Sequence, residues 1–172
     1  MEIIVPSLVC VFRSHHVPTA LRTSALSLLS ECVKTSSLAF LPYTLELSEA
    51  MVDLLQIESM PEASKTNTRG FKPKEPKATM DSESTVIDSK HPALRRAALH
   101  FLALLIRSST ADVYNSGYIY NGPTFSGPQA RRAKTTLAYV ASTDVDNFVR
   151  VMAREVLEGM DQLNEAFIGN VA

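Results

Sequence analysis

The chain has 172 residues, of which 45% are hydrophobic and 20% are charged, and its 17 basic and 18 acidic residues leave a formal charge of −1. This length predicts one domain, and the apolar content excludes wholesale disorder. The charge balance argues against a dedicated nucleic-acid-binding module, because neutralising phosphates needs a basic excess. Cys10 and Cys32, without spaced Cys or His partners, exclude a disulfide framework and a zinc finger. We therefore expect a reducing compartment.

The apolar start of the chain is a candidate secretory signal. The run from Ile3 to Phe12 has a suitable length, but Glu2 stands where such signals carry Lys or Arg. We interpret this run as a buried helix. No apolar stretch approaches the roughly 20 residues that span a bilayer, so we expect no membrane span.

Three regions have helical periodicity, and none shows the alternation of a strand. The first covers residues 2–58, with breaks at 14–19 and near Pro42, and Thr19 is the expected N-cap of a helix over 20–36. The second covers 92–108. The third covers about 128–163 and is interrupted near 143–144. Along 20–36 one apolar stripe recurs at three- and four-residue spacing, formed by Leu21, Ala25, Leu28, Leu29 and Cys32.

Two segments between these regions lack helical periodicity. Residues 59–91 are rich in Pro, Ser, Thr and Lys, and we expect a disordered linker. Its basic block at 65–77 is either a solvated linker or a nuclear-localisation or acidic-partner patch. Residues 111–127 include a Gly- and Tyr-containing stretch, YNSGYIYNGPTFSG, and we expect a flexible loop there. The predicted organisation is helices in 1–58 and 92–172, forming one continuous array around the linker.

A short motif recurs three times. TALRTSALSLL at 19–29 matches PALRRAALHFL at 92–102, and NFVRVMAREVL at 147–157 is a third copy. The shared pattern is an apolar residue, Arg, two variable residues, Ala, three variable residues and Leu. Apolar, Ala and Leu positions four apart lie on one helix face, and the small Ala lets a neighbouring helix approach.

This pattern is typical of the inner helix of a HEAT repeat. It predicts an all-α, HEAT/armadillo-like α-solenoid of about three helical hairpins, forming the end of a longer array. Arg22, Arg95 and Arg150 occupy one register, where they could join adjacent repeats or contact an acidic partner. Asp144 and Asp146 precede the third copy, and we interpret them as helix caps rather than paired catalytic carboxylates.

The segments 20–55, 92–108 and 137–163 resemble the C-terminal region of the RNA polymerase II assembly factor family, whose animal relatives are the Transport and Golgi organisation (Tango) proteins. The most specific pieces are RRAALHFLALL and TDVDNFVRVMAREVLEGMD. The resemblance implies a HEAT-type adaptor that binds RNA polymerase II subunits or assembly chaperones in the cytoplasm and supports nuclear import. We therefore expect a cytoplasmic protein, for which the import role also allows a nuclear location. The alternatives are a protein-secretion or Golgi-organisation factor of the same family, and a generic HEAT interaction module.

No residues converge on a catalytic, cofactor or metal site in the sequence. His15 and His16 form a polar turn without further spaced donors. Cys10 and Cys32 lie within apolar stripes, so we expect both to be buried, and His100 is expected to serve packing or to lie at the surface. We therefore expect a protein without enzymatic activity, cofactor or direct nucleic-acid contact. The partner, its binding face and the oligomeric state stay open.

Overall fold

The computed structural model describes residues 4–14, 16–59, 91–116 and 127–169. Within these residues the chain forms α-helices and one 3-10 helix, and no strand. The elements are α1 (Ile4–Arg13), α2 (Thr19–Thr35), η1 (Ser37–Tyr43), α3 (Thr44–Ser59), α4 (Pro92–Ser116), α5 (Gly127–Thr143) and α6 (Asn147–Gly169). The prediction of an all-α fold is confirmed.

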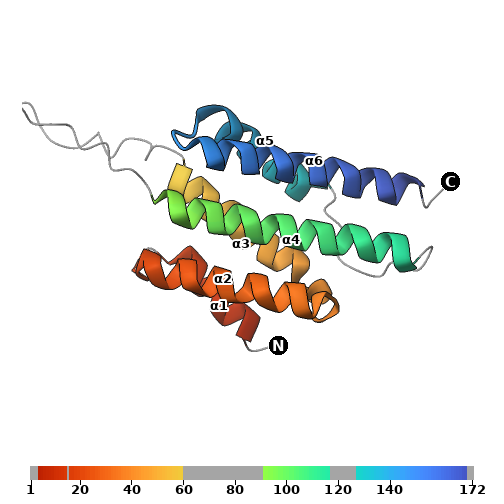
Figure 1. Ribbon diagram of the computed structural model, residues 1–172, viewed down its shortest axis with the longest axis horizontal. Helices are drawn as coiled ribbons and strands as arrows, with labels where there is room; N and C mark the ends of the chain where they lie inside the picture. Colours follow the sequence, from red (N-terminus) through yellow and green to blue (C-terminus); the bar gives the residue numbers. More distant parts are fainter. Residues whose placement is uncertain (1–3, 15, 60–90, 117–126, 170–172) are drawn as a thin grey trace, which may run out of the picture.

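The helices pack in two layers (Figure 1). In one layer α4 lies between α2 and α6, and the three helices run in the same direction. In the other layer α3 contacts both α1 and α5. The layers meet where α3 packs on α4 and α5 packs on α6, and the helices of each pair run in opposite directions. The three copies of the sequence motif therefore begin α2, α4 and α6 at the same end of one layer.

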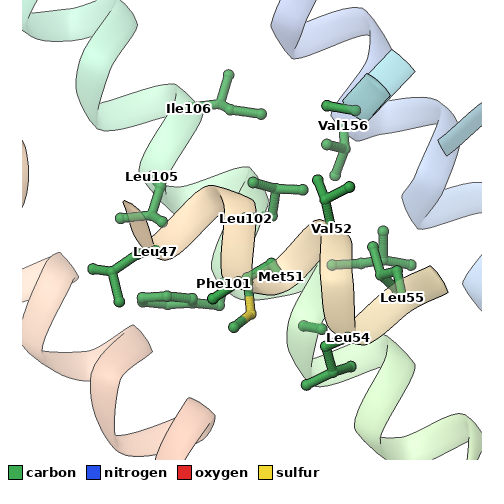
Figure 2. Packing of buried hydrophobic residues seen from close by; sticks show 14 of the residues in the cluster. Leu47, Met51, Val52, Leu54, Leu55, Phe101, Leu102, Leu105, Ile106 and Val156 are labelled. Carbon is green, nitrogen blue, oxygen red and sulfur yellow. The ribbon is translucent and has the colours of Figure 1, made fainter. Parts of the chain in front are cut away.

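The centre of the core lies between α3 and α4 (Figure 2). Met51 of α3 and Phe101 of α4 are both fully buried. Val156 brings α6 to the same core. Complete burial of side chains of this size contributes roughly 1.5–3 kcal/mol each, so the α3–α4 contact is one of the contacts that stabilise the core.

The first helical region divides near residues 14–18 and near Pro42, as expected, but the second break is a 3-10 helix and the helix after the first break begins without the expected N-cap. Pro42 lies inside η1, whose 3-10 geometry takes the place of the start of a second α-helix. Thr19 is the first helical residue rather than the N-cap, because the extended residue before the helix is Pro18 and no side chain caps this end. The prediction of a Thr19 N-cap is wrong.

The helix after the linker is longer than its periodicity predicts. It continues past 108 to Ser116, into the segment expected to be a loop. Val113 is buried there, and the hydroxyls of Ser109 and Thr110 donate to the carbonyls of Leu105 and Ile106. Burial therefore outweighs the weak helical preference of this polar stretch. The remainder of the expected loop, 117–126, and nearly all of the expected disordered linker at 59–91 lie outside the described residues.

The C-terminal region divides at 144–146, close to the predicted interruption. Its last helix extends beyond Leu163 to Gly169, because Ala166 is also buried. The one described glycine with a positive φ, Gly127 at 64°, begins α5, and this conformation costs glycine little.

Candidate functional site

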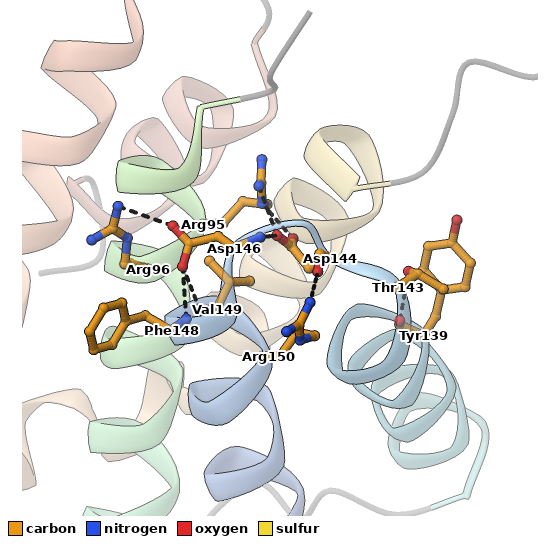
Figure 3. A network of polar contacts seen from close by, with 9 residues as sticks. All are labelled: Arg95, Arg96, Tyr139, Thr143, Asp144, Asp146, Phe148, Val149 and Arg150. Atoms are coloured by element: carbon orange, nitrogen blue, oxygen red, sulfur yellow. Dashed lines mark hydrogen bonds and ion pairs between the residues drawn. The ribbon is translucent and has the colours of Figure 1, made fainter. Parts of the chain in front are cut away.

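Arg95 forms a buried ion pair with Asp144 of the turn between α5 and α6 (Figure 3). Its Nε lies 2.7 Å from Asp144 Oδ2, and its Nη2 donates to Asp144 Oδ1 at 3.0 Å. Both side chains are almost completely buried, at 3% and 2% exposure. The planar guanidinium fork matches a carboxylate in this two-point geometry. We call the antiparallel pairs α3–α4 and α5–α6 helical hairpins. Because Arg95 belongs to α4 and Asp144 to the turn between α5 and α6, the ion pair joins these two successive hairpins.

Asp146 organises the start of α6 in the same turn. Its Oδ1 accepts the backbone N–H groups of Phe148 at 2.8 Å and Val149 at 3.2 Å, which makes it the N-cap of α6. Its other oxygen lies 3.2 Å from Arg96 Nη2. Asp144 accepts the N–H of Asp146 at 2.9 Å. The prediction of a capping acid therefore fits Asp146, whereas Asp144 mainly pairs with Arg95.

Arg22 repeats this arrangement one hairpin earlier. Its Nη2 lies 3.4 Å from Glu58 Oε1, and the two side chains are only 6% and 8% exposed. Glu58 stands at the end of α3, as Asp144 stands at the end of α5. An acid at a helix C-terminus is unfavourable for the helix dipole, and the arginine offsets that cost. In both cases an arginine of the α2, α4, α6 layer reaches an acid of the following hairpin.

Arg150, the third arginine of the register, binds within its own hairpin. Its Nη1 donates to the carbonyl of Asp144 at 2.9 Å, and its Nη2 donates to Asn147 Oδ1 at 3.1 Å. Arg150 thus supports the turn that holds Asp144 toward Arg95. The structure brings Arg95, Arg150, Asp144 and Asp146 together at one turn and places Arg22 with Glu58 elsewhere.

A second polar cluster lies in the layer of α1, α3 and α5 and was not predicted from the sequence. Asp53 of α3 pairs with Arg13 of α1 at 2.6 Å and with Arg132 of α5. Gln56 of α3 donates to Thr136 of α5 at 2.8 Å and accepts from Arg132 at 2.6 Å. Asp53 and Gln56 interrupt an apolar run, and that interruption is the only local signal of their role.

The remaining candidate residues are isolated. Cys10 is exposed, so the prediction of its burial is wrong: α1 turns Val5, Val9 and Phe12 inward, and Cys10 lies about 100° around the helix from Val9. Cys32 is half-buried. His16 and His100 are exposed, and His15 lies outside the described residues. No group of three or more His, Cys, Asp or Glu side chains in the described ranges is arranged to hold a metal ion.

The fold and these contacts define an all-helical protein whose successive helical hairpins are joined by buried arginine–carboxylate pairs. None of its described helices is both long and apolar enough to cross a membrane. No protein-family model matches the chain, and neither a curated protein nor a solved structure shows significant similarity to it.

Proposed function

We propose that this chain is a non-catalytic HEAT-type adaptor that assists assembly of RNA polymerase II in the cytoplasm and its import into the nucleus. It acts through protein–protein contacts with polymerase subunits or assembly chaperones. Stacked helical hairpins suit this role, because they present a long rigid surface that folded domains and peptides can contact.

The observation that carries the adaptor class is the repeated arginine–acid contact. Arg22 and Arg95 occupy the same register of two parallel helices, and each pairs with an acid of the next hairpin. In a bundle of amphipathic helices that are not repeats of one another, the same arginine–acid contact would not be expected at equivalent positions. Both arginines are buried, which favours a role in joining repeats over direct contact with an acidic partner.

The polymerase assignment depends on the resemblance of RRAALHFLALL and TDVDNFVRVMAREVLEGMD to the assembly factor family. The first piece, residues 95–105, lies in the first half of α4, and the second, residues 143–161, spans the Asp144–Asp146 turn and most of α6. The specific segments are thus the ones that build the joined hairpins. A factor in protein secretion is the alternative that the same resemblance allows.

Affinity purification of the tagged full chain from cells, with quantitative mass spectrometry, tests the proposal. We expect enrichment of RNA polymerase II subunits and assembly chaperones, with most of the chain in the cytoplasm. A Phe101→Asp variant, which should not fold, controls for capture of unfolded protein by general chaperones. Enrichment of Golgi or coat components instead would contradict the polymerase assignment and favour the secretion alternative.

A further inference from the structure

The central helix α4 presents a row of basic side chains to the solvent. Arg96, His100 and Arg107 are spaced four and seven residues apart, so they lie on one face of the helix. His100 and Arg107 are exposed, and the side chain of Arg96 is 43% exposed. We call these three residues the α4 row.

The neighbouring helices leave the α4 row exposed. Within its layer α4 lies between α2 and α6, and α3 packs on it from the other layer (Figure 1). These contacts accompany the burial of Leu99, Phe101 and Ile106 of α4, but the row stays exposed. Because α4 already has a neighbour on both sides, a further helical repeat at either edge of the layer would pack on α2 or α6 and would not cover the row.

The positive charge of the α4 row is only partly neutralised. No acidic residue occurs in the sequence from 91 to 111. Arg96 pairs with Asp146 at 3.2 Å, whereas His100 and Arg107 have no ion-pair partner among the described residues. The Arg107 guanidinium therefore offers a permanent charge and several hydrogen-bond donors to a partner.

The two flanks of the α4 row differ in charge. In the register of the repeated motif, Lys34 of α2 aligns with Arg107, and Glu155 of α6 aligns with His100. Lys34 is neutralised by Glu31 at 2.7 Å, whereas Glu155 is exposed and has no ion-pair partner in the described part of the chain. A negatively charged segment on the row is therefore repelled on the α6 side and tolerated on the α2 side.

Apolar side chains border the row. Ala97 and Leu104 of α4 are half-buried and pack against the core, so each also contributes surface beside the basic residues. A peptide can use both kinds of surface, through its carboxylates and its apolar side chains. Nucleic acid fits less well, because binding its phosphates needs a larger basic excess than this row supplies beside Glu155.

We propose that the α4 row binds an acidic segment of a partner protein. Carboxylates of that segment accept hydrogen bonds from Arg107 and His100, and its apolar side chains pack on Leu104 and Ala97. This inference rests on the proposed adaptor function, for which it names the chemistry of the partner and the surface that receives it.

Fluorescence anisotropy with the full chain tests the proposal. The probe is a fluorescein-labelled peptide of repeated Glu-Glu-Leu, and a peptide of repeated Lys-Lys-Leu controls for the sign of the charge. We expect saturable binding of the acidic peptide, which added salt weakens and Arg107→Glu weakens at least about tenfold. Arg131→Glu is the matched control, because Arg131 is also exposed but lies on α5 in the other layer. It makes the same change in net charge and should leave binding nearly unchanged.

Four results would overturn the binding surface: no saturable binding of the acidic peptide, equal weakening by Arg131→Glu, equal binding of the basic peptide, or tighter binding of a labelled single-stranded RNA. Far-UV circular dichroism should show that both variants keep the wild-type helix content, since both residues are exposed. A chain that enriches polymerase subunits but does not bind the acidic peptide refutes the binding surface alone. A chain that binds the peptide but enriches no polymerase subunit refutes the polymerase assignment alone.

Discussion

Replacement of Arg95 by alanine is the sharpest test of how the hairpins are joined. The variant removes both contacts to Asp144, at 2.7 and 3.0 Å, and leaves that carboxylate buried, where it still accepts the N–H of Asp146. Breaking a buried pair from one side costs about 3–5 kcal/mol, because the remaining charge has lost both water and partner. We expect the free energy of unfolding to fall by this amount.

The neighbouring Arg96 is a matched control. It also pairs with an acid of the same turn, Asp146 at 3.2 Å, but its side chain is 43% exposed. Solvent screens such a pair, so Arg96→Ala should cost only about 0–1 kcal/mol. The two variants delete the same side chain one residue apart and differ mainly in burial.

Urea denaturation followed by far-UV circular dichroism measures both variants, and partner co-purification is measured in parallel. If Arg95 joins repeats, Arg95→Ala lowers stability more than it lowers partner capture. Unchanged stability with lost capture would refute this reasoning and assign Arg95 to the partner contact. The double substitution Arg95→Met, Asp144→Leu should recover much of the lost stability, because it leaves no unpaired buried charge.

Substitutions at other positions test three further parts of the fold: the N-cap of α6, the contact of α6 with α4, and the burial of the core. Asp146→Ala should lower the free energy of unfolding by about 0.5–2 kcal/mol in urea denaturation, because α6 loses its N-cap; an unchanged value would contradict the capping role. Gly159→Leu should cost about 1–3 kcal/mol, since a Cβ placed at this glycine would lie only 3.3 Å from Ile106 Cγ2. Adding Ile106→Ala should make room for the leucine and restore part of the lost stability. Phe101→Ala should lower the free energy of unfolding by about 3–5 kcal/mol, because Phe101 is fully buried. Leu28→Ala should change it by no more than about 0.5 kcal/mol, because Leu28 is exposed. Similar losses in the two variants would contradict this difference in burial.

Much of the fold could be predicted from local pattern. The three- and four-residue periodicity identified the helical regions, and the acids at 144 and 146 marked the start of α6. Periodicity failed where burial overrode weak propensity, as at Val113 in the last turns of α4. It also failed at Pro42, where the chain forms a 3-10 helix.

For the ion pair between Arg22 and Glu58, the sequence predicted the arginine but not its acidic partner. The repeated motif identified Arg22 and Arg95, but nothing near Glu58 indicated that it would pair with Arg22 across 36 positions of sequence. The Asp53 cluster likewise joins α1, α3 and α5, which are far apart in the chain. A local pattern identifies the residue that needs a partner, whereas the packing of distant helices selects the partner.

The sequence by itself determined that the chain is helical and that three helices share one register of Arg, Ala and apolar residues. Only the tertiary structure decided that Leu94 and Phe101 are buried while Leu21 and Leu28, in the same register, are exposed. The physical reason is that helical periodicity specifies which side chains share a face, whereas burial of that face depends on a neighbouring helix that the pattern does not encode.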